Sequence, residues 1–101
     1  MADLTVILWR DIPAQVTAAG NGRSARAELS DRFQKAIDAA AMRAGLVESD
    51  AYLEEWRRES RPCGDDLEQE VADEVARLEA AFTPDVLLSL SRSGGTRQSL
   101  T

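Results

Sequence analysis

The chain has 101 residues, the length of one small domain with a single hydrophobic core. Hydrophobic residues make up 44% of it, and 18 acidic against 12 basic side chains give a formal net charge of −6. This acid excess argues against a nucleic-acid-binding protein held by phosphate contacts and against a polybasic membrane module, so neither kind of partner is expected.

The lack of histidine narrows the chemistry further. It excludes histidine-based catalytic triads and histidine-containing zinc sites, and the single cysteine excludes an intrachain disulfide. We assign no metal site and no cofactor. The acidic start Met1-Ala2-Asp3 is unlike a secretory signal peptide, and no apolar stretch approaches the ~20 residues of a transmembrane helix. We expect a cytoplasmic protein.

Two strands are expected first along the chain. Residues 5–9, Thr-Val-Ile-Leu-Trp, form a short apolar run of mainly β-branched and aromatic residues, which predicts a strand. Pro13 interrupts this run, and residues 14–19 form a weaker second strand that the sequence Gly-Asn-Gly ends. Because the two strands are joined locally, they predict an antiparallel hairpin.

Two long amphipathic helices are expected next. Over residues 24–44 and again over 66–82, large apolar residues and alanines recur at offsets of 0, +4, +8, +11 and +15, which is one helical face. Ser24 is the expected N-cap of the first helix, and Gly45 follows its end. Asp65 is the expected N-cap of the second helix.

Two shorter helices complete the expected fold. One covers residues 50–60 after the cap Ser49, and the other covers 84–91, where a threonine precedes a proline at the first helical position. The predicted fold class is α+β, an N-terminal β-hairpin packed against three to four α-helices, in one domain over residues 1–91. The polar residues 92–101 are expected to form a flexible tail.

The densest group of acidic residues lies near the start of the second long helix. Such acids could hold a divalent cation, but they are also typical of the first turn and solvated face of a helix, which we favour. These acids are Asp65, Asp66, Glu68, Glu70, Asp73 and Glu74. Cys63, just before them, is a reactive thiol or an ordinary turn cysteine, and nearby acids oppose thiolate formation.

Most candidate binding residues are tryptophans and arginines, the types most enriched at protein-binding hot spots. Asp11 and Cys63 complete the set. Each has a structural alternative: the tryptophans can pack in the core, and Arg10 and Asp11 can form a local ion pair. We expect one face with Trp9, Arg10, Trp56 and Arg57 to contact a partner. The complete candidate set is Trp9, Arg10, Asp11, Trp56, Arg57 and Cys63.

Several blocks of sequence, in order over about residues 4–90, resemble a family of small bacterial proteins labelled "virulence factor". They include Leu-Trp-Arg-Asp-Ile-Pro-Ala-Gln-Val (8–16), Ala-Met-Arg-Ala-Gly (41–45), Tyr-Leu-Glu-Glu-Trp-Arg-Arg (52–58) and Pro-Cys-Gly-Asp-Asp-Leu-Glu (62–68). The resemblance implies no catalytic residues. It also implies that the gene lies beside genes for one-carbon enzymes, which points to a small accessory subunit.

The leading hypothesis is a non-enzymatic accessory or protein-interaction protein with an unidentified protein partner. An exposed edge of the hairpin also invites a homodimer, because a two-stranded sheet alone is marginal. The alternative, which the resemblance suggests, is a ligand-binding or catalytic component of a folate- or corrinoid-linked methyl-transfer system. The two differ in whether Trp9, Arg10, Trp56 and Cys63 converge on one pocket.

Overall fold

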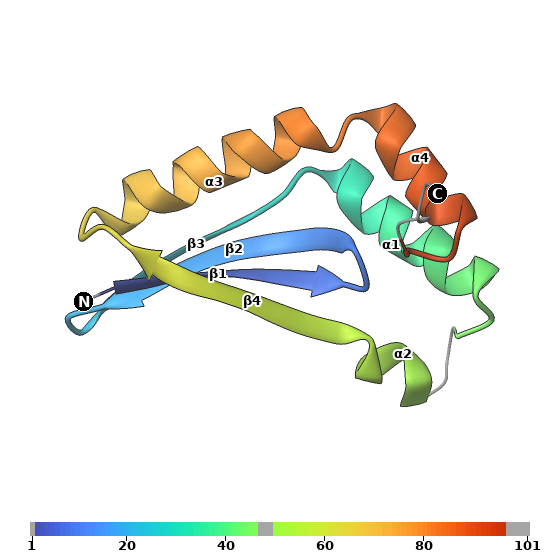
Figure 1. The fold of residues 1–101 in the computed structure, drawn as a ribbon, viewed down its shortest axis with the longest axis horizontal. Helices are drawn as coiled ribbons and strands as arrows, with labels where there is room; N and C mark the ends of the chain where they lie inside the picture. Colours follow the sequence, from blue (N-terminus) through green and yellow to red (C-terminus); the bar gives the residue numbers. More distant parts are fainter. Residues whose placement is uncertain (1, 47–49, 97–101) are drawn as a thin grey trace, which may run out of the picture.

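Four antiparallel strands form a single sheet in the computed structural model, which describes residues 2–46 and 50–96. The strand order is β3-β2-β1-β4 (Figure 1). β1 (Ala2–Trp9) is central and pairs with β2 (Ile12–Gly20) and β4 (Trp56–Cys63), while β2 also pairs with β3 (Arg23–Glu28). The two outermost strands are therefore β3 and β4.

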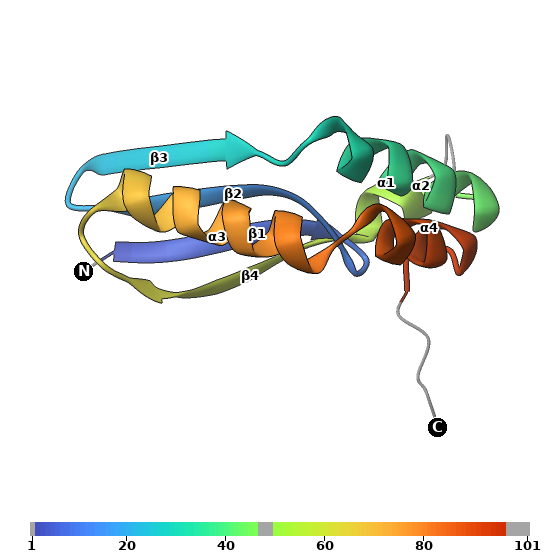
Figure 2. The ribbon, with the colours of Figure 1, turned by 90° about the horizontal axis from the view of Figure 1, so that it is seen from above.

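Among the described helices, α3 (Leu67–Ala81) covers part of one face of the sheet. It runs along this face of the sheet (Figure 2). Its contacts with the sheet are mainly to β2 and β3. α1 (Asp31–Arg43) and α4 (Pro84–Arg92) pack against each other beyond one end of the sheet, and the short α2 (Asp50–Glu54) leads into β4. No helix in the described part of the chain is long and apolar enough to cross a bilayer.

The two faces of the sheet differ in polarity because successive side chains of a strand point to opposite sides. Leu4, Val6 and Leu8 of β1 face α3 and are buried. The opposite face carries half-buried and exposed side chains such as Thr5, Thr17, Arg26 and Arg58. The core continues between the sheet and the α1–α4 pair, through Trp9, Ile12, Phe33, Ile37, Ala40, Leu87 and Leu90.

The prediction of a helix from residue 24 is wrong over its first part. Residues 23–28 form β3, and α1 begins at Asp31 after the N-cap Ser30, not Ser24. The sequence Arg-Ser-Ala-Arg-Ala-Glu alternates, with Ala25 and Ala27 partly buried and their neighbours exposed. Alanine fits either element, so strand pairing with β2 decides the conformation here.

The prediction of a helix over 50–60 is also wrong beyond Glu54. Residues 56–63 form β4, and Pro62 and Cys63 belong to this strand rather than to a turn. The segment lacks the alternating apolar pattern of a half-buried strand, since every residue from Arg57 to Pro62 is exposed. Its pairing with β1 is a long-range contact that local sequence does not encode. The predicted cap Ser49 lies outside the described residues.

The C-terminal helices agree closely with expectation. α3 and α4 begin and end within a residue or two of the predicted positions, and Thr83 accepts a hydrogen bond from the Val86 N–H at 3.3 Å. The N-cap of α3 is Asp66, one residue after the expected Asp65, and its side chain accepts from the Gln69 N–H at 3.3 Å. Gly45 follows α1 with a φ of +72°, as expected.

The predicted flexible tail begins too early. Arg92 is the last residue of α4, and the chain then turns back so that the Gly95 N–H donates to the Leu90 carbonyl at 2.7 Å. The Gly95 carbonyl accepts from the Asp11 N–H at 2.9 Å. Residues 92–96 therefore belong to the folded domain, and residues 97–101 lie outside the described residues.

Replacing Phe33 with alanine tests the core. Phe33 is 1% exposed and its ring lies 6.0 Å from that of Phe82, so the Phe33→Ala change should lower the free energy of unfolding by about 3–5 kcal/mol. Met42→Ala on the exposed face of the same helix, at 71% exposure, should change it by about 0.5 kcal/mol or less. Urea unfolding measures both, and equal losses would contradict the assigned helix orientation.

A second stability test concerns Gly95. Its φ is +92°, and a Cβ there would lie 2.8 Å from the buried Trp9 ring, so Gly95→Ala adds a clash of about 1–3 kcal/mol to the backbone strain. Gly22→Ala is the matched control, because Gly22 has a φ of +75° with nothing within 4 Å. It should cost only the strain of about 1–2 kcal/mol. Thermal unfolding that ranks Gly22→Ala as the worse variant would contradict this packing.

Candidate functional site

Most candidate residues meet where β1 turns into β2 and β4 begins. Trp9 and Trp56 are directly opposite in the β1–β4 pairing, and Arg10 and Asp11 form the turn between β1 and β2. We call this group of residues, 9–11 with Trp56 and Arg57, the turn site. The structure thus brings five of the six candidates together.

Trp9 lies in the core and does not contribute to a surface. Its side chain is 0% exposed, and its indole N–H donates to the Tyr52 carbonyl at 2.9 Å. The Tyr52 ring is 5.5 Å away, and Trp56 in turn meets Tyr52 edge-on at 6.2 Å. The packing alternative is therefore correct for Trp9, whereas Trp56 is half-buried.

Arg10 joins the turn to two distant segments. It has a φ of +53°, and its guanidinium lies 5.2 Å from the centre of the Trp9 ring in a cation–π contact. The same group forms an ion pair with Glu55 at 3.0 Å and donates to the Gly94 carbonyl at 2.9 Å. Arg10 therefore has a structural role, because it helps to hold the turn that follows α4 at Gly94 and Gly95.

Arg57 fixes the other side of the turn. Its Nε donates to the Arg10 carbonyl at 2.9 Å, and a terminal nitrogen pairs with Asp11 at 3.1 Å. It also pairs with Glu59 two residues along β4, and this hydrogen bond is the largest cause that raises the pKa of Arg57. Arg57 is exposed, so these pairs leave its outer surface open to solvent.

Cys63 is separated from the turn site. It lies at the far end of β4, opposite Ala2, seven residues beyond Trp56, or about 23 Å along a strand. Partial desolvation, followed by the charge of Glu70, raises the pKa of its thiol, which disfavours the thiolate. Cys63 therefore does not converge with Trp9, Arg10 and Trp56 on one pocket.

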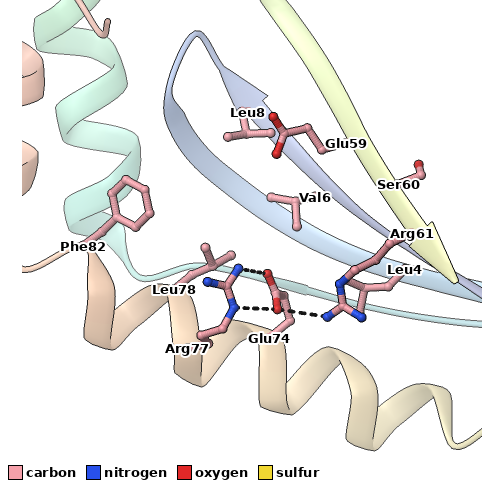
Figure 3. Close-up of a pocket in the computed structure, with 10 residues that line it drawn as sticks. All are labelled: Leu4, Val6, Leu8, Glu59, Ser60, Arg61, Glu74, Arg77, Leu78 and Phe82. Atoms are coloured by element: carbon pink, nitrogen blue, oxygen red, sulfur yellow. Dashed lines mark hydrogen bonds and ion pairs between the residues drawn. The ribbon is translucent and has the colours of Figure 1, made fainter. Parts of the chain in front are cut away.

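A groove lies between α3 and β4 and was not predicted from the sequence. It has a volume of about 410 Å³, and Leu4, Val6 and Leu8 of β1 form its apolar floor (Figure 3). The α3 side chains Leu78 and Arg77 line one wall. The groove exists because α3 packs mainly on β2 and β3 and contacts β1 less, so the space between α3 and β4 is not filled.

Glu74 spans this groove as a buried carboxylate. It is only 4% exposed, accepts hydrogen bonds from Arg61 of β4 at 3.2 Å and from the Arg77 Nε at 3.0 Å, and links α3 to β4. The Arg77 hydrogen bond is the largest cause that lowers the pKa of Glu74. The prediction of a solvated position for Glu74 is therefore wrong. Glu74 lies three residues after Val71 and four before Leu78, so it shares the buried helix face with them. This spacing was the sequence signal for its burial.

The outer edge of β4 is the second feature that was not predicted. The Arg10 N–H donates to the Glu55 carbonyl at 3.1 Å, which fixes the alternation of the antiparallel ladder. That alternation turns the backbone groups of Arg57, Glu59 and Arg61 toward β1. It turns those of Arg58 and Ser60 outward, where no strand of the described residues pairs with them.

The described side chains give little support for a metal site. In residues 2–46 and 50–96 no group of three cysteine, aspartate or glutamate side chains could hold a metal ion. The acidic residues near the start of α3 have structural contacts instead: Asp66 caps the helix and Asp73 accepts from the Gln69 side chain at 2.7 Å. The arrangement offers a groove and a strand edge.

The buried carboxylate gives a pH-dependent prediction. Glu74→Gln removes the charge that the arginines contact and should lower the free energy of unfolding at pH 7 by about 1–3 kcal/mol. A lowered pKa in the folded protein means that this stabilisation exists above the ordinary pKa of 4.5 and disappears as the pH falls through the lowered value. The difference between wild type and variant should therefore shrink below a pH of about 4.5.

Urea unfolding between pH 7 and pH 3 measures this difference. Glu68→Gln is the matched control, because Glu68 is an exposed acid on the same helix. Its effect should stay near 0.5 kcal/mol or less at pH 7. A Glu74→Gln effect that grows as the pH falls would contradict the assigned contacts.

Comparison with known proteins gives a family. No curated protein and no solved structure matches the chain. A family model does match, and it agrees with the resemblance seen in the sequence blocks of β1, α2, β4 and the start of α3. Because that model covers residues 7–90, most of the chain, this protein belongs to the family described as "Virulence factor".

Proposed function

We propose that this protein is a non-enzymatic protein-interaction module, an accessory protein whose partner adds a strand to the outer edge of β4. The observation that supports the proposal is the edge itself. β4 has eight residues, its middle six are exposed, and one side of its backbone is turned away from β1. An exposed strand edge gives affinity through main-chain hydrogen bonds, and its side chains give specificity.

The surroundings of β4 favour this use over simple solvent exposure. Figure 2 shows β4 at the rim of the sheet, with no described helix or strand alongside its outer edge. The groove beside it provides an apolar floor formed by Leu4, Val6 and Leu8. Trp56 and Arg57, at the start of the strand, supply the residue types that are common at binding hot spots. The candidate residues of the turn site thus contribute through these two.

The methyl-transfer alternative gains no such support. It needs a pocket that combines the turn site with Cys63, whereas Trp9 is buried and Cys63 lies at the other end of β4. We therefore propose that binding, and not chemistry on a small ligand, is the activity of this surface.

Ser60→Pro tests the proposal. Ser60 turns its N–H outward, so a proline there removes a donor from the free edge and leaves the backbone donors that β1 uses. It also removes the Ser60 hydroxyl, which is hydrogen-bonded to the Thr5 hydroxyl at 2.8 Å, so Ser60→Ala serves as the control for that loss. In affinity capture from the native cell, a partner that binds wild type should be lost at least tenfold with Ser60→Pro.

Ser24→Pro on β3 is the matched control. The Leu29 N–H donates to the Ala14 carbonyl, so the same alternation turns the Ser24 N–H outward at the opposite edge of the sheet. Ser24→Pro should capture the partner as wild type does, with folding of both variants checked by circular dichroism. Equal capture by both proline variants would contradict an interaction through β4.

A further inference from the structure

The chemistry of β4 restricts which strand can pair with it. On the side of the groove the strand carries Arg57, Glu59 and Arg61, and on the other face it carries Arg58 and Ser60. Pro62 lies at an outward-facing position and has no N–H to donate, so a new strand can be fully bonded only before it. The usable edge is therefore short and strongly charged, and most strands would place like or unpaired charges against it.

We infer that the strand that pairs with β4 is β4 of a second copy of this chain, antiparallel to the first, with the two-fold axis at Arg58. The inference rests on the proposed function, because it needs the outer edge of β4 to be a binding surface. It adds the identity of the partner and the register of the pairing.

Symmetry leaves few registers to consider. In an antiparallel pair, directly opposite residues lie on the same face of the sheet, so the two-fold axis must pass beside one residue of each copy. With the axis at Arg58, Trp56 lies opposite Ser60 of the second copy and Arg57 lies opposite Glu59 of the second copy. Arg58, Trp56 and Ser60 all face outward, so they form the hydrogen-bonded pairs, and Pro62 is not needed.

Other positions of the two-fold axis give less favourable contacts between the two strands. An axis at Glu59 brings the two Glu59 side chains together, sets Arg57 against Arg61, and places Pro62 opposite Trp56. An axis at Ser60 sets Glu59 opposite Arg61, but it places Pro62 opposite Arg58 and loses a donor in each copy, so backbone bonding decides against it. An axis at Arg57 brings the two Arg57 side chains together. Like charges directly opposite destabilise a strand pair, so the two Arg58 side chains are also a cost of the chosen register, which two Arg57–Glu59 pairs and a full set of backbone donors offset.

The chosen register also agrees with a contact that already exists. Arg57 pairs with Glu59 within one chain, so two copies would set four charges of alternating sign around the axis on the groove side. Arg57 and Glu59 occupy non-hydrogen-bonded pairs, where opposite side chains approach most closely. The two Arg58 side chains meet on the opposite, solvated face, where water and salt screen their repulsion.

The result is one continuous sheet of eight strands, in the order β3-β2-β1-β4-β4-β1-β2-β3. Because the axis is perpendicular to the sheet, both α3 helices lie on the same face. The two grooves, each next to its own β4, then become neighbours between these helices. The β1–β4 part of the sheet in one copy thus joins the β1–β4 part of the sheet in the other.

Cysteine cross-linking tests the register. In a Cys63→Ser background, Arg58→Cys places the two new thiols in a hydrogen-bonded pair with Cα atoms about 5.5 Å apart, within the range of a disulfide. Ser60→Cys is the matched control on the same edge, because the two Ser60 positions are separated by about 13 Å, four residues along the strand. Mild oxidation should give a covalent dimer with Arg58→Cys and at least tenfold less with Ser60→Cys.

Charge reversal supplies a second test without new thiols. Glu59→Arg sets Arg57 against a like charge and should weaken the dimer, measured by sedimentation equilibrium, by about tenfold. Combining it with Arg57→Glu exchanges the two charges and should restore much of the affinity. Arg57→Glu also removes the contacts of Arg57 with Asp11 and the Arg10 carbonyl, so the exchanged variant is compared with Arg57→Glu alone. Failure of the exchanged pair to bind more tightly than Arg57→Glu alone would contradict the pairing of these residues.

The remaining outcomes separate this inference from the proposed function. A wild-type protein that stays monomeric at 1 mM, or a cross-link formed through Ser60→Cys instead of Arg58→Cys, overturns the inference. If the protein is monomeric but Ser60→Pro still loses a captured partner that Ser24→Pro retains, the β4 edge serves a different protein and the proposed function stands. Unchanged capture and unchanged sedimentation with Ser60→Pro would overturn both.

Discussion

The pairing of β4 with β1 is the contact on which the rest of the molecule depends. It joins residues 2–9 to residues 56–63, which are far apart in the sequence, and makes β1 a central strand. Trp9 at its end is then buried against Tyr52, and Arg61 reaches the buried carboxylate of Glu74 on α3. The groove and the free edge of β4 are consequences of the same pairing, because α3 packs mainly on β2 and β3.

Charged side chains on an edge strand both prevent unwanted strand pairing and select a matching partner. Edge strands with arginine, glutamate and proline resist indiscriminate pairing, because a random strand sets like charges together or meets a missing donor. The same features select a partner whose charges alternate in the right register. For β4, Arg57 and Glu59 define that register and Pro62 limits its length, so protection and specificity come from the same few side chains.

The parts of the fold that were predictable are those with local signals. Val71, Leu78 and Phe82 follow the helical period of α3, and Thr83 before Pro84 marks α4. β3 and β4 carried weaker signals: the inward positions of β3 are alanines, which fit a helix or a strand, and β4 is exposed along its middle six residues. Only their long-range partners identify them as strands. The candidate residues near Trp9 were found by residue type, whereas Glu74 and the β4 edge became visible only with the tertiary fold.

Residue-by-residue amide hydrogen exchange, followed by nuclear magnetic resonance, tests the central claim most directly. In dilute protein the amides of Arg57, Glu59 and Arg61 should be protected by β1 while those of Arg58 and Ser60 exchange rapidly. As the protein concentration rises, protection should extend to Arg58 and Ser60. Rapid exchange at Arg57 and Glu59 would show that β4 does not pair with β1, and rapid exchange at Arg58 and Ser60 at every concentration would contradict pairing between two copies.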